Sequence, residues 1–352
     1  MFQKDERDLK VGRHPFCKAR IIVLFFLFLA FGAANAGAQI KEEKEESKIE
    51  ALGKDVRKEK ANARKKLFSS IEVSTGYETN AKLSQTRKGD TFQEALYSLA
   101  FRHPLPHQLR FTFNYDVNLQ EYDEMTDLSN LLNHFKLGLQ KVLYKSLIMG
   151  VGYDASLVYC RLNEDSNFVF QKGFVYLRHN LSKKAYHQVM IENGAKDYTS
   201  AEALAESSSS FKEDKRQDDR QIAEYSWGML MTPKLFLKLR GRFSVNDSNA
   251  DFQDFYDYKS YDFSPRVSYK ISNTLSLNGN IMFTRKKYGS RNVSGQDFKQ
   301  VDDLYSAGLG LRYLVNTKDS LSLNYSYHQA DSNDHQADYS GSGITAGWRH
   351  AF

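Results

Sequence analysis

The chain has 352 residues, a formal net charge of +6 and 41% hydrophobic residues. Residues 1–36 and 41–66 carry most of the positive charge, so the remainder is near neutral and shows no nucleic-acid-binding module. After the N-terminus no apolar run approaches the ~20 residues that a transmembrane helix needs. Only 5 prolines accompany 21 tyrosines and 24 phenylalanines, which fits long strands with aromatic girdles.

The N-terminus has the three parts of a secretory signal. Lysines and arginines are frequent in residues 1–20, residues 21–31 are apolar, and Ala34-Asn35-Ala36 is a small-x-small cleavage site. We therefore predict a signal peptide over 1–36. Residues 37–66 are rich in Glu and Lys and indicate a charged periplasmic tail, either a solvated helix or a disordered segment, with a plug or a cell-wall contact as the alternative role.

Two segments of the remaining chain show the clearest strand periodicity. Apart from Phe236, apolar or small side chains at odd positions alternate with polar or charged side chains at even positions in residues 235–245 and 261–271. Eleven residues at ~3.3 Å each, tilted by ~40°, rise about 28 Å, enough to cross the ~25 Å apolar band of an outer membrane. The pattern predicts membrane-spanning β-strands.

Similar segments recur to the C-terminus. We predict about 14 strands with cores at 70–77, 92–102, 109–119, 133–143, 147–159, 168–177, 186–195, 221–231, 235–245, 261–271, 275–285, 305–315, 321–329 and 339–352. Their connections alternate in length, as the short 232–234 and 272–274 and the long 198–220, 246–260 and 286–304 illustrate. This alternation favours an all-β fold: a transmembrane antiparallel β-barrel over 67–352, with short periplasmic turns, long extracellular loops and both termini in the periplasm.

The connection 198–220 is long and its residues 199–219 are partly compatible with a helix. We expect it either to fold inward as a constriction or to remain outside as a solvated cap.

The inward-facing positions carry the candidate functional residues. If apolar side chains face lipid, the neighbouring strands 235–245 and 261–271 place a basic stripe on the lumen: Lys238, Arg240, Arg242, Arg266 and Lys270. Further predicted lumen charges are Arg102, Arg110, Lys136, Arg312, Asp116 and Asp154. These cations either pair with carboxylates and fill the lumen, or form a positive stripe that favours anions in a channel.

Signals for chemistry are weak. No His-x-Ser occurs, as a barrel phospholipase would need, and the near-repeat of His328 and Asp331 with His335 and Asp338 lies in one polar loop. Cys160 would be alone after signal cleavage, and we expect it at the lumen side near the outer end of its strand. We therefore expect no catalytic residue, no metal site and no cofactor.

The last strand ends in Thr345-Ala346-Gly347-Trp348-Arg349-His350-Ala351-Phe352. It resembles the C-terminal assembly signal of Gram-negative outer-membrane barrels, in which Thr345, Gly347, Trp348 and Phe352 match the pattern and His350 departs from it. The resemblance implies recognition by the barrel-assembly machinery and periplasmic chaperones, and contact with outer-membrane lipid and lipopolysaccharide. At the level of pattern, residues 67–352 resemble porin-like barrels.

Two functions from different classes follow. The first is a porin-like channel for passive diffusion of small hydrophilic solutes, anions among them, for which we expect a monomer. The alternative is a barrel without a channel that acts in surface interaction, or as an accessory to surface-lipoprotein export, because residues 76–80 (Gly-Tyr-Glu-Thr-Asn) also resemble the start of such barrels.

Overall fold

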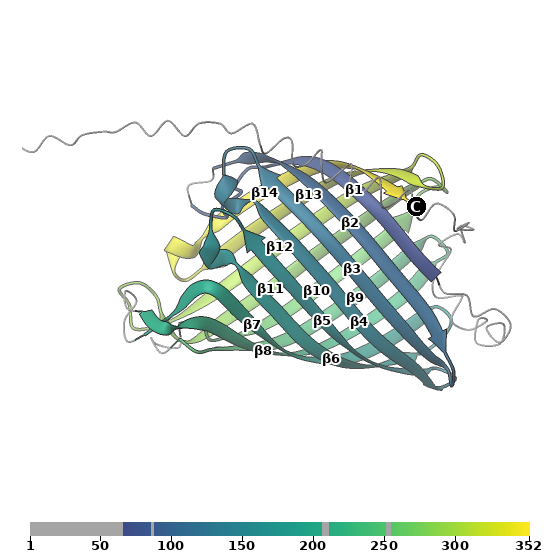
Figure 1. The fold of residues 1–352 in the computed structure, drawn as a ribbon, viewed down its shortest axis with the longest axis horizontal. Helices are drawn as coiled ribbons and strands as arrows, with labels where there is room; N and C mark the ends of the chain where they lie inside the picture. The colour runs from purple at the N-terminus through teal and green to yellow at the C-terminus, as the bar shows by residue number, and fades with distance from the viewer. Residues whose placement is uncertain (1–65, 86–87, 206–210, 251–254) are drawn as a thin grey trace, which may run out of the picture. The chain divides into compact units, whose positions relative to one another are not determined.

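The computed structural model describes residues 66–85, 88–205, 211–250 and 255–352. The predicted signal peptide 1–36 lies outside the described residues, as does nearly all of the predicted tail 37–66. The described residues form fourteen antiparallel strands in one closed barrel (Figure 1). They are β1 (Lys66–Glu78), β2 (Asp90–Leu105), β3 (Leu109–Tyr122), β4 (Asn130–Tyr144), β5 (Leu147–Cys160), β6 (Phe168–Asn180), β7 (Ala185–Leu204), β8 (Phe211–Thr232), β9 (Leu235–Ser248), β10 (Tyr258–Lys270), β11 (Leu275–Asn292), β12 (Lys299–Leu314), β13 (Asp319–Ser332) and β14 (Tyr339–Ala351).

Each strand pairs with its neighbours in sequence, and β14 pairs with β1 to close the barrel, with Val73 opposite Trp348. The predicted all-β barrel of about 14 strands is therefore confirmed. Closure also fixes which strands face each other across the interior. Strands seven apart in this ring lie on opposite sides, so β1 to β3 face β8 to β10.

The two faces of the sheet differ as the strand periodicity predicts. Outward side chains are large, apolar and uncovered by protein: Ile281 is 58% exposed, Leu309 51% and Tyr325 49%. Inward positions are polar and covered, such as Ser264 with 2% exposure. Because so many uncovered apolar side chains are unfavourable in water, this band requires lipid around it. No helix among the described residues is long and apolar enough to cross a membrane.

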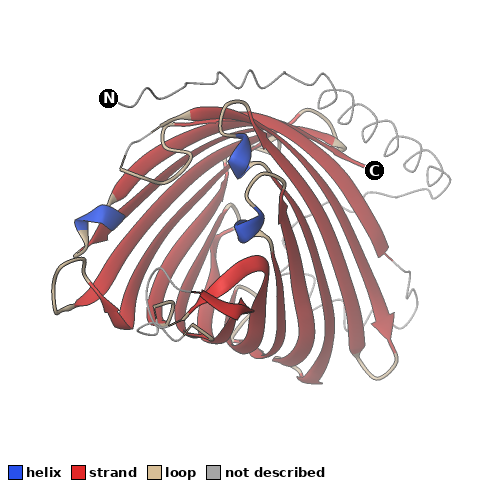
Figure 2. Ribbon diagram, turned by 60° about the vertical axis from the view of Figure 1, so that its left-hand side comes forward, coloured by secondary structure: helices blue, strands red, loops and turns tan. Residues whose placement is uncertain are grey.

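The connections sort by length between the two ends of the barrel. One end, here called the short-turn end, has connections of two to four residues, and the other, the long-loop end, has connections of six to eleven. The long connections hold the 3-10 helices η1 (Thr126–Leu128), η2 (Glu164–Ser166) and η4 (His335–Ala337) (Figure 2). Several short turns repeat one motif: the Ser182 hydroxyl accepts from Lys184 and Ala185 amides, and the Ser272 hydroxyl accepts from Thr274 and Leu275 amides.

The long-loop end corrects the predicted boundaries. Residues 199–219 are largely paired strand, because β7 continues to Leu204 and β8 begins at Phe211, so the expectation of a long, partly helix-compatible connection is wrong. The β7–β8 hairpin projects beyond its neighbours (Figure 1). Outside the bilayer both faces of a hairpin meet water, so backbone pairing persists after the alternation of hydrophobicity has ended. The predicted connections 246–260 and 286–304 shrink for the same reason.

Candidate functional site

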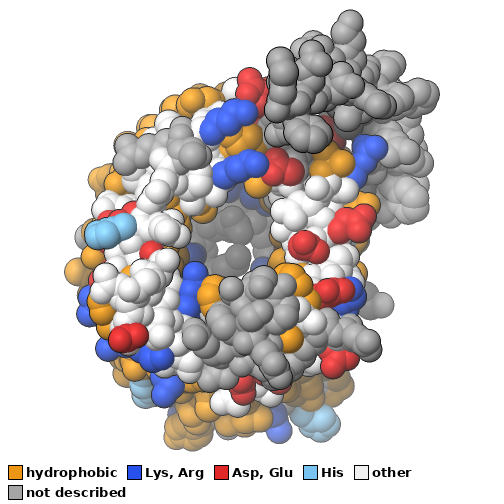
Figure 3. All heavy atoms as spheres, turned by 90° about the vertical axis from the view of Figure 1, so that its left-hand side faces the viewer, with side chains coloured by type: hydrophobic (Ala, Val, Ile, Leu, Met, Phe, Trp, Pro, Cys, Tyr) orange, Lys and Arg blue, Asp and Glu red, His pale blue; other side chains and the backbone are white. Residues whose placement is uncertain are grey.

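The candidate site is the lumen of the barrel. Seen from the long-loop end, the barrel is hollowed at its centre, and Lys and Arg side chains lie at the edge of the hollow (Figure 3). The even-numbered side chains of β3 to β13 face inward, and in β14 the odd-numbered ones do, because Trp348 and Ile344 lie outward. These inward residues divide into sectors with different charge.

The first sector, the ion network, lies on β3 to β7 and consists of Asp116, His134, Lys136, Asp154, Lys172 and Glu192. Asp154, with 6% exposure, is its centre. One carboxylate oxygen lies 3.0 Å from His134 Nε2, and the other lies 3.5 Å from Lys136 Nζ and 3.9 Å from Lys172 Nζ. The network continues from Lys172 to Glu192, 2.8 Å away. Asp154 and Lys136, both predicted on the lumen, are therefore paired charges, and the predicted Asp116 lies 3.5 Å from His134 Nδ1.

The second sector, the basic wall, contains the predicted stripe on β9 and β10: Lys238, Arg240, Arg242, Arg266 and Lys270. The barrel brings these residues together, because Arg266 is the direct cross-strand partner of Lys238. The nearest carboxylates are distant: Arg240 Nη1 lies 4.0 Å from Glu224, and Arg242 Nε lies 4.0 Å from Asp262. Among the described residues, Lys238, Arg266 and Lys270 have no carboxylate within 4.0 Å.

A third group, the cation–aromatic cluster, lies above the basic wall toward the long-loop end. It interleaves rings and cations from β6, β7, β8, β10 and the β9–β10 connection: Phe168, Phe170, Lys196, Tyr198, Arg216, Arg220, Tyr256 and Tyr258. Arg216 Cζ lies 3.3 Å from the Tyr256 ring centroid and 4.5 Å from that of Tyr198. The alternation of hydrophobicity does not predict this cluster, because residues 198–220 lack it and are predicted as a loop. Lys196 and Tyr198 are two residues apart, and so are Arg216, Asp218 and Arg220. This period of two is the sequence signal that could have indicated continued strands here.

Across the lumen from β8 to β10, the inward face of β1 to β3 is acidic. The Glu94 carboxylate accepts from Asn118 Nδ2 at 2.8 Å and from the Ser74 hydroxyl at 3.1 Å, and the Glu78 carboxylate accepts from the Tyr122 hydroxyl at 2.9 Å. Within the described ranges, neither Glu has a Lys or Arg nitrogen within 4.0 Å. Negative and positive walls therefore oppose each other.

The sector on β11 to β14 is largely neutral at mid-height and is lined by small or amide side chains. Gly308 faces the Asn280 side chain, and Gly310 faces that of Asn324. The remaining predicted lumen cations lie near the short-turn end: Arg312 Nε donates to the Ser320 hydroxyl at 3.2 Å, Arg102 lies 5.6 Å from the Phe68 ring centroid, and Arg110 is the second residue of β3.

The residues of the predicted assembly signal lie on the strand that closes the barrel. Thr345, Gly347 and Trp348 are in β14, and Phe352 follows its last residue. A side chain at Gly347 would meet the Ser322 hydroxyl at 2.9 Å and Ser74 Cβ at 3.1 Å, so both neighbouring strands restrict this position. Cys160 ends β5 and is buried, as a small inward residue would be.

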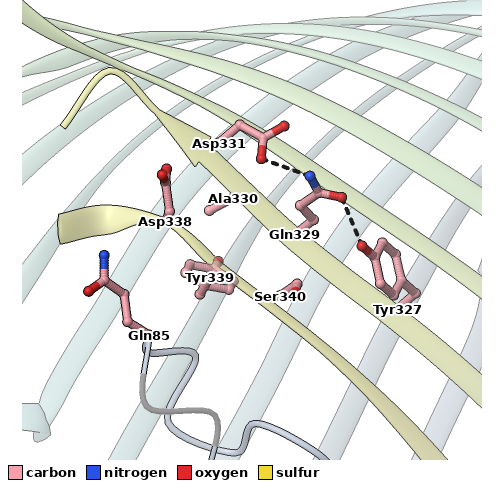
Figure 4. A pocket seen from close by; sticks show the side chains of 8 residues that line it. All are labelled: Gln85, Tyr327, Gln329, Ala330, Asp331, Asp338, Tyr339 and Ser340. Carbon is pink, nitrogen blue, oxygen red and sulfur yellow. Dashed lines mark hydrogen bonds between the residues drawn. The ribbon is translucent and has the colours of Figure 1, made fainter. Parts of the chain in front are cut away.

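A separate pocket of about 330 Å³ lies at the long-loop ends of β13 and β14 (Figure 4). Gln329 bridges Tyr327 and Asp331 there, with hydrogen bonds of 2.8 Å and 2.7 Å. These odd-numbered β13 residues belong to the outward face that also carries Tyr325, so we do not assign the pocket to the lumen. Among the described residues, no three His, Cys, Asp or Glu side chains gather as metal ligands.

Comparisons with known proteins agree with this architecture. Residues 256–352, from just before β10 to the end, match the family model described as "Putative beta-barrel porin 2". A search of curated proteins gives no match.

Similar solved structures include outer-membrane-expressed OmpT of Vibrio cholerae, with 8% identity, a TM-score of 0.47 and coverage of 83% of this chain and 99% of that one. The Pseudomonas putida toluene transporter TodX has 10% identity, a TM-score of 0.43 and coverage of 83% and 90%. The anion-selective porin from Comamonas acidovorans has 9% identity, a TM-score of 0.44 and coverage of 82% and 99%. The closed barrel and its outward apolar band are those of an outer-membrane β-barrel, and residues 256–352 match a porin family model.

Proposed function

We propose that this protein is a channel through which small hydrophilic solutes diffuse passively across the outer membrane, with a preference for anions. The observation that carries the proposal is the basic wall, where Lys238 and Arg266 face a polar lumen without a carboxylate within 4.0 Å among the described residues. The hollow seen along the barrel (Figure 3) supports a path for solutes.

The preference follows from the balance of charges along the wall. A cation already paired with a carboxylate presents little net charge to a passing ion, whereas an unpaired cation raises the local concentration of anions. Because ions in solution screen such charges, the Debye length falls from ~10 Å at 0.1 M salt to ~3 Å at 1 M. The preference should therefore weaken as the salt concentration rises.

The test is the zero-current potential of the protein in a planar bilayer with a KCl gradient. Wild-type protein should prefer chloride, and replacing Arg240, Arg242 and Arg266 together by Ser should shift the potential toward cation preference. Arg285→Ser is the control, because Arg285 pairs with Asp303 at 2.6 Å on the outward face, so its loss should leave selectivity unchanged.

A wild-type channel that prefers K⁺ would contradict the anion preference, and so would a triple variant with an unchanged potential. Absence of any steady current from the folded protein would instead favour the interaction barrel.

We also propose that the short-turn end and both termini face the periplasm, since short turns characterise the periplasmic side of such barrels. A protease added to intact cells should cut the β7–β8 connection 205–210 and leave the N-terminal residues 39–66 intact. The reverse cleavage pattern would invert the topology.

A further inference from the structure

The cation–aromatic cluster differs from the basic wall in what surrounds its cations. Arg220 on β8 donates from Nε to Asn246 Oδ1 at 3.2 Å and from Nη2 to the Tyr258 hydroxyl at 2.8 Å. Both acceptors are neutral, and among the described residues no carboxylate lies within 4.0 Å of Arg220. A guanidinium has five N–H donors, so Arg220 keeps donors and its full charge for a ligand.

Lys196 on β7 resembles Arg220, because its hydrogen-bond acceptor is also a neutral group. Its Nζ donates to the Tyr198 hydroxyl at 2.7 Å. The carboxylate of Asp218, its cross-strand partner, accepts instead two hydrogen bonds from Arg216, of 2.9 Å and 2.7 Å. Arg216 is thus neutralised, while no carboxylate of the described chain comes within 4.0 Å of the Lys196 ammonium.

The sheet register places these two cations around a position without a side chain. Gly194 is the cross-strand partner of both Lys172 and Arg220, and Lys196 is two residues further along β7 on the same face. A side chain at Gly194 would meet Lys172 Cβ at 2.5 Å, so glycine is required there. Lys172 is already paired with Glu192 at 2.8 Å, which leaves Lys196 and Arg220 as the available cations beside Gly194.

Aromatic rings border the same place. The Phe168 ring centroid lies 3.8 Å from Lys196 Nζ, and the centroids of Phe170 and Tyr258 lie 5.8 Å and 6.0 Å from Arg220 Cζ. A cation stacked closely on a ring uses that ring, but the two rings near Arg220 are at the limit of cation–π contact. Both rings are half-buried, and Tyr258 also lies 4.7 Å from Lys286 Nζ, so only the ring surface that they still expose can pack against a flat apolar group.

Building on the proposed anion channel, we propose that this cluster is a binding site for small organic anions that carry a planar aromatic ring. The carboxylate accepts hydrogen bonds from Arg220 and Lys196, and the ring packs against Phe170 and Tyr258. Anion and ring are both needed, because a simple anion leaves the rings unused and a neutral aromatic compound leaves two cations without a counter-charge.

Benzoate is the probe. Full-length protein in planar bilayers with KCl should show a current that benzoate reduces in a concentration-dependent way. Acetate, which has the charge without the ring, and benzyl alcohol, which has the ring without the charge, should each require about tenfold higher concentration, since a charged hydrogen bond and an aromatic contact are each worth about tenfold in affinity.

Two variants test the two parts of the site. Arg220→Gln should raise the half-blocking concentration of benzoate about tenfold. Phe170→Leu should raise it about threefold while leaving the effect of acetate unchanged. Arg285→Gln is the matched control, because it removes one cation from the outward face, where Arg285 pairs with Asp303 away from the lumen and the rings, and it should leave benzoate block as in wild type.

The outcomes separate this inference from the proposed function. An anion-selective channel that benzoate blocks no better than acetate would overturn the inference alone, as would equal effects of Arg220→Gln and Arg285→Gln. If no current is found, equilibrium binding of radiolabelled benzoate to the full chain in detergent micelles still tests whether the cluster binds an aromatic anion. Loss of that binding in Arg220→Gln supports the site, and equal binding by wild type and variant overturns it.

Discussion

The ion network and the basic wall contain similar residues on similar strands, yet the cations of the network are paired with carboxylates and those of the wall are largely not. In the network, the cross-strand row across β4, β5 and β6 reads Lys136, Asp154, Lys172, so each cation has a carboxylate beside it. In the basic wall, the row across β8, β9 and β10 reads Gly228, Lys238, Arg266, so two cations are neighbours. The order of charges around the barrel, more than their number, decides which cations remain unpaired.

This contrast has a physical consequence for each sector. Alternating charges at 3–4 Å stabilise one another and present little field to the lumen, whereas adjacent like charges repel and depend on water and mobile anions for compensation. We therefore expect the network to contribute mainly to stability and the basic wall mainly to ion selectivity.

The largest effect should come from the closing strand, because neither sector exists unless β14 pairs with β1. Deleting Phe352 should leave secretion intact but remove most of the folded protein from the outer membrane, since the resemblance assigns this residue to the assembly signal. Phe352→Tyr keeps a terminal aromatic ring and should assemble normally. Heat-modifiable migration of the outer-membrane fraction in SDS gels measures the folded form; normal yield of the truncated chain would contradict the assignment.

A smaller effect should separate the two sectors directly. Asp154→Asn leaves His134, Lys136 and Lys172 without their common carboxylate and should cost about 3 kcal/mol of unfolding free energy, as breaking a buried ion pair does. Asp262→Asn removes a carboxylate 4.0 Å from Arg242 and should cost less than about 1 kcal/mol. Urea unfolding in detergent micelles, followed by the fluorescence of the two tryptophans, measures both. Equal costs would refute the division of roles.

The smallest effect concerns an exposed pair outside the lumen. Lys82 Nζ lies 2.8 Å from Asp127 in η1, with side chains 45% and 40% exposed, and its hydrogen bond lowers the pKa of Asp127. A carboxyl whose pKa is lower in the folded state stabilises the fold at pH values above its unfolded-state pKa. This contribution to stability is lost as the pH falls through the folded-state pKa. Lys82→Gln should therefore cost less than about 0.5 kcal/mol at neutral pH, and the cost should vanish in acid once the Asp127 carboxyl is protonated. A cost that is unchanged in acid would show that the contact is not electrostatic.

Much of the architecture follows from the sequence, because the bilayer imposes a simple rule on each strand. Within its apolar band, alternation reports directly which side chain meets lipid, so the strand cores, the alternation of turn lengths and the inward position of residues such as Arg240 and Asp154 could be predicted. Beyond that band the rule ends. The outer halves of β7 and β8 consequently lie beyond the predicted strand cores, with Lys196 just after the core 186–195 and Arg220 in the predicted connection 198–220.

Only the tertiary structure decided which charges meet. Alternation assigns Lys136, Lys238 and Arg266 to the lumen equally well, but the register between strands determines that Lys136 lies beside Asp154 and Lys238 beside Arg266. The sequence alone therefore determined a barrel with a charged interior. Strand register and closure, through distances of 3–4 Å that depend on neighbouring strands, decided where that charge is neutralised and where it remains for a solute.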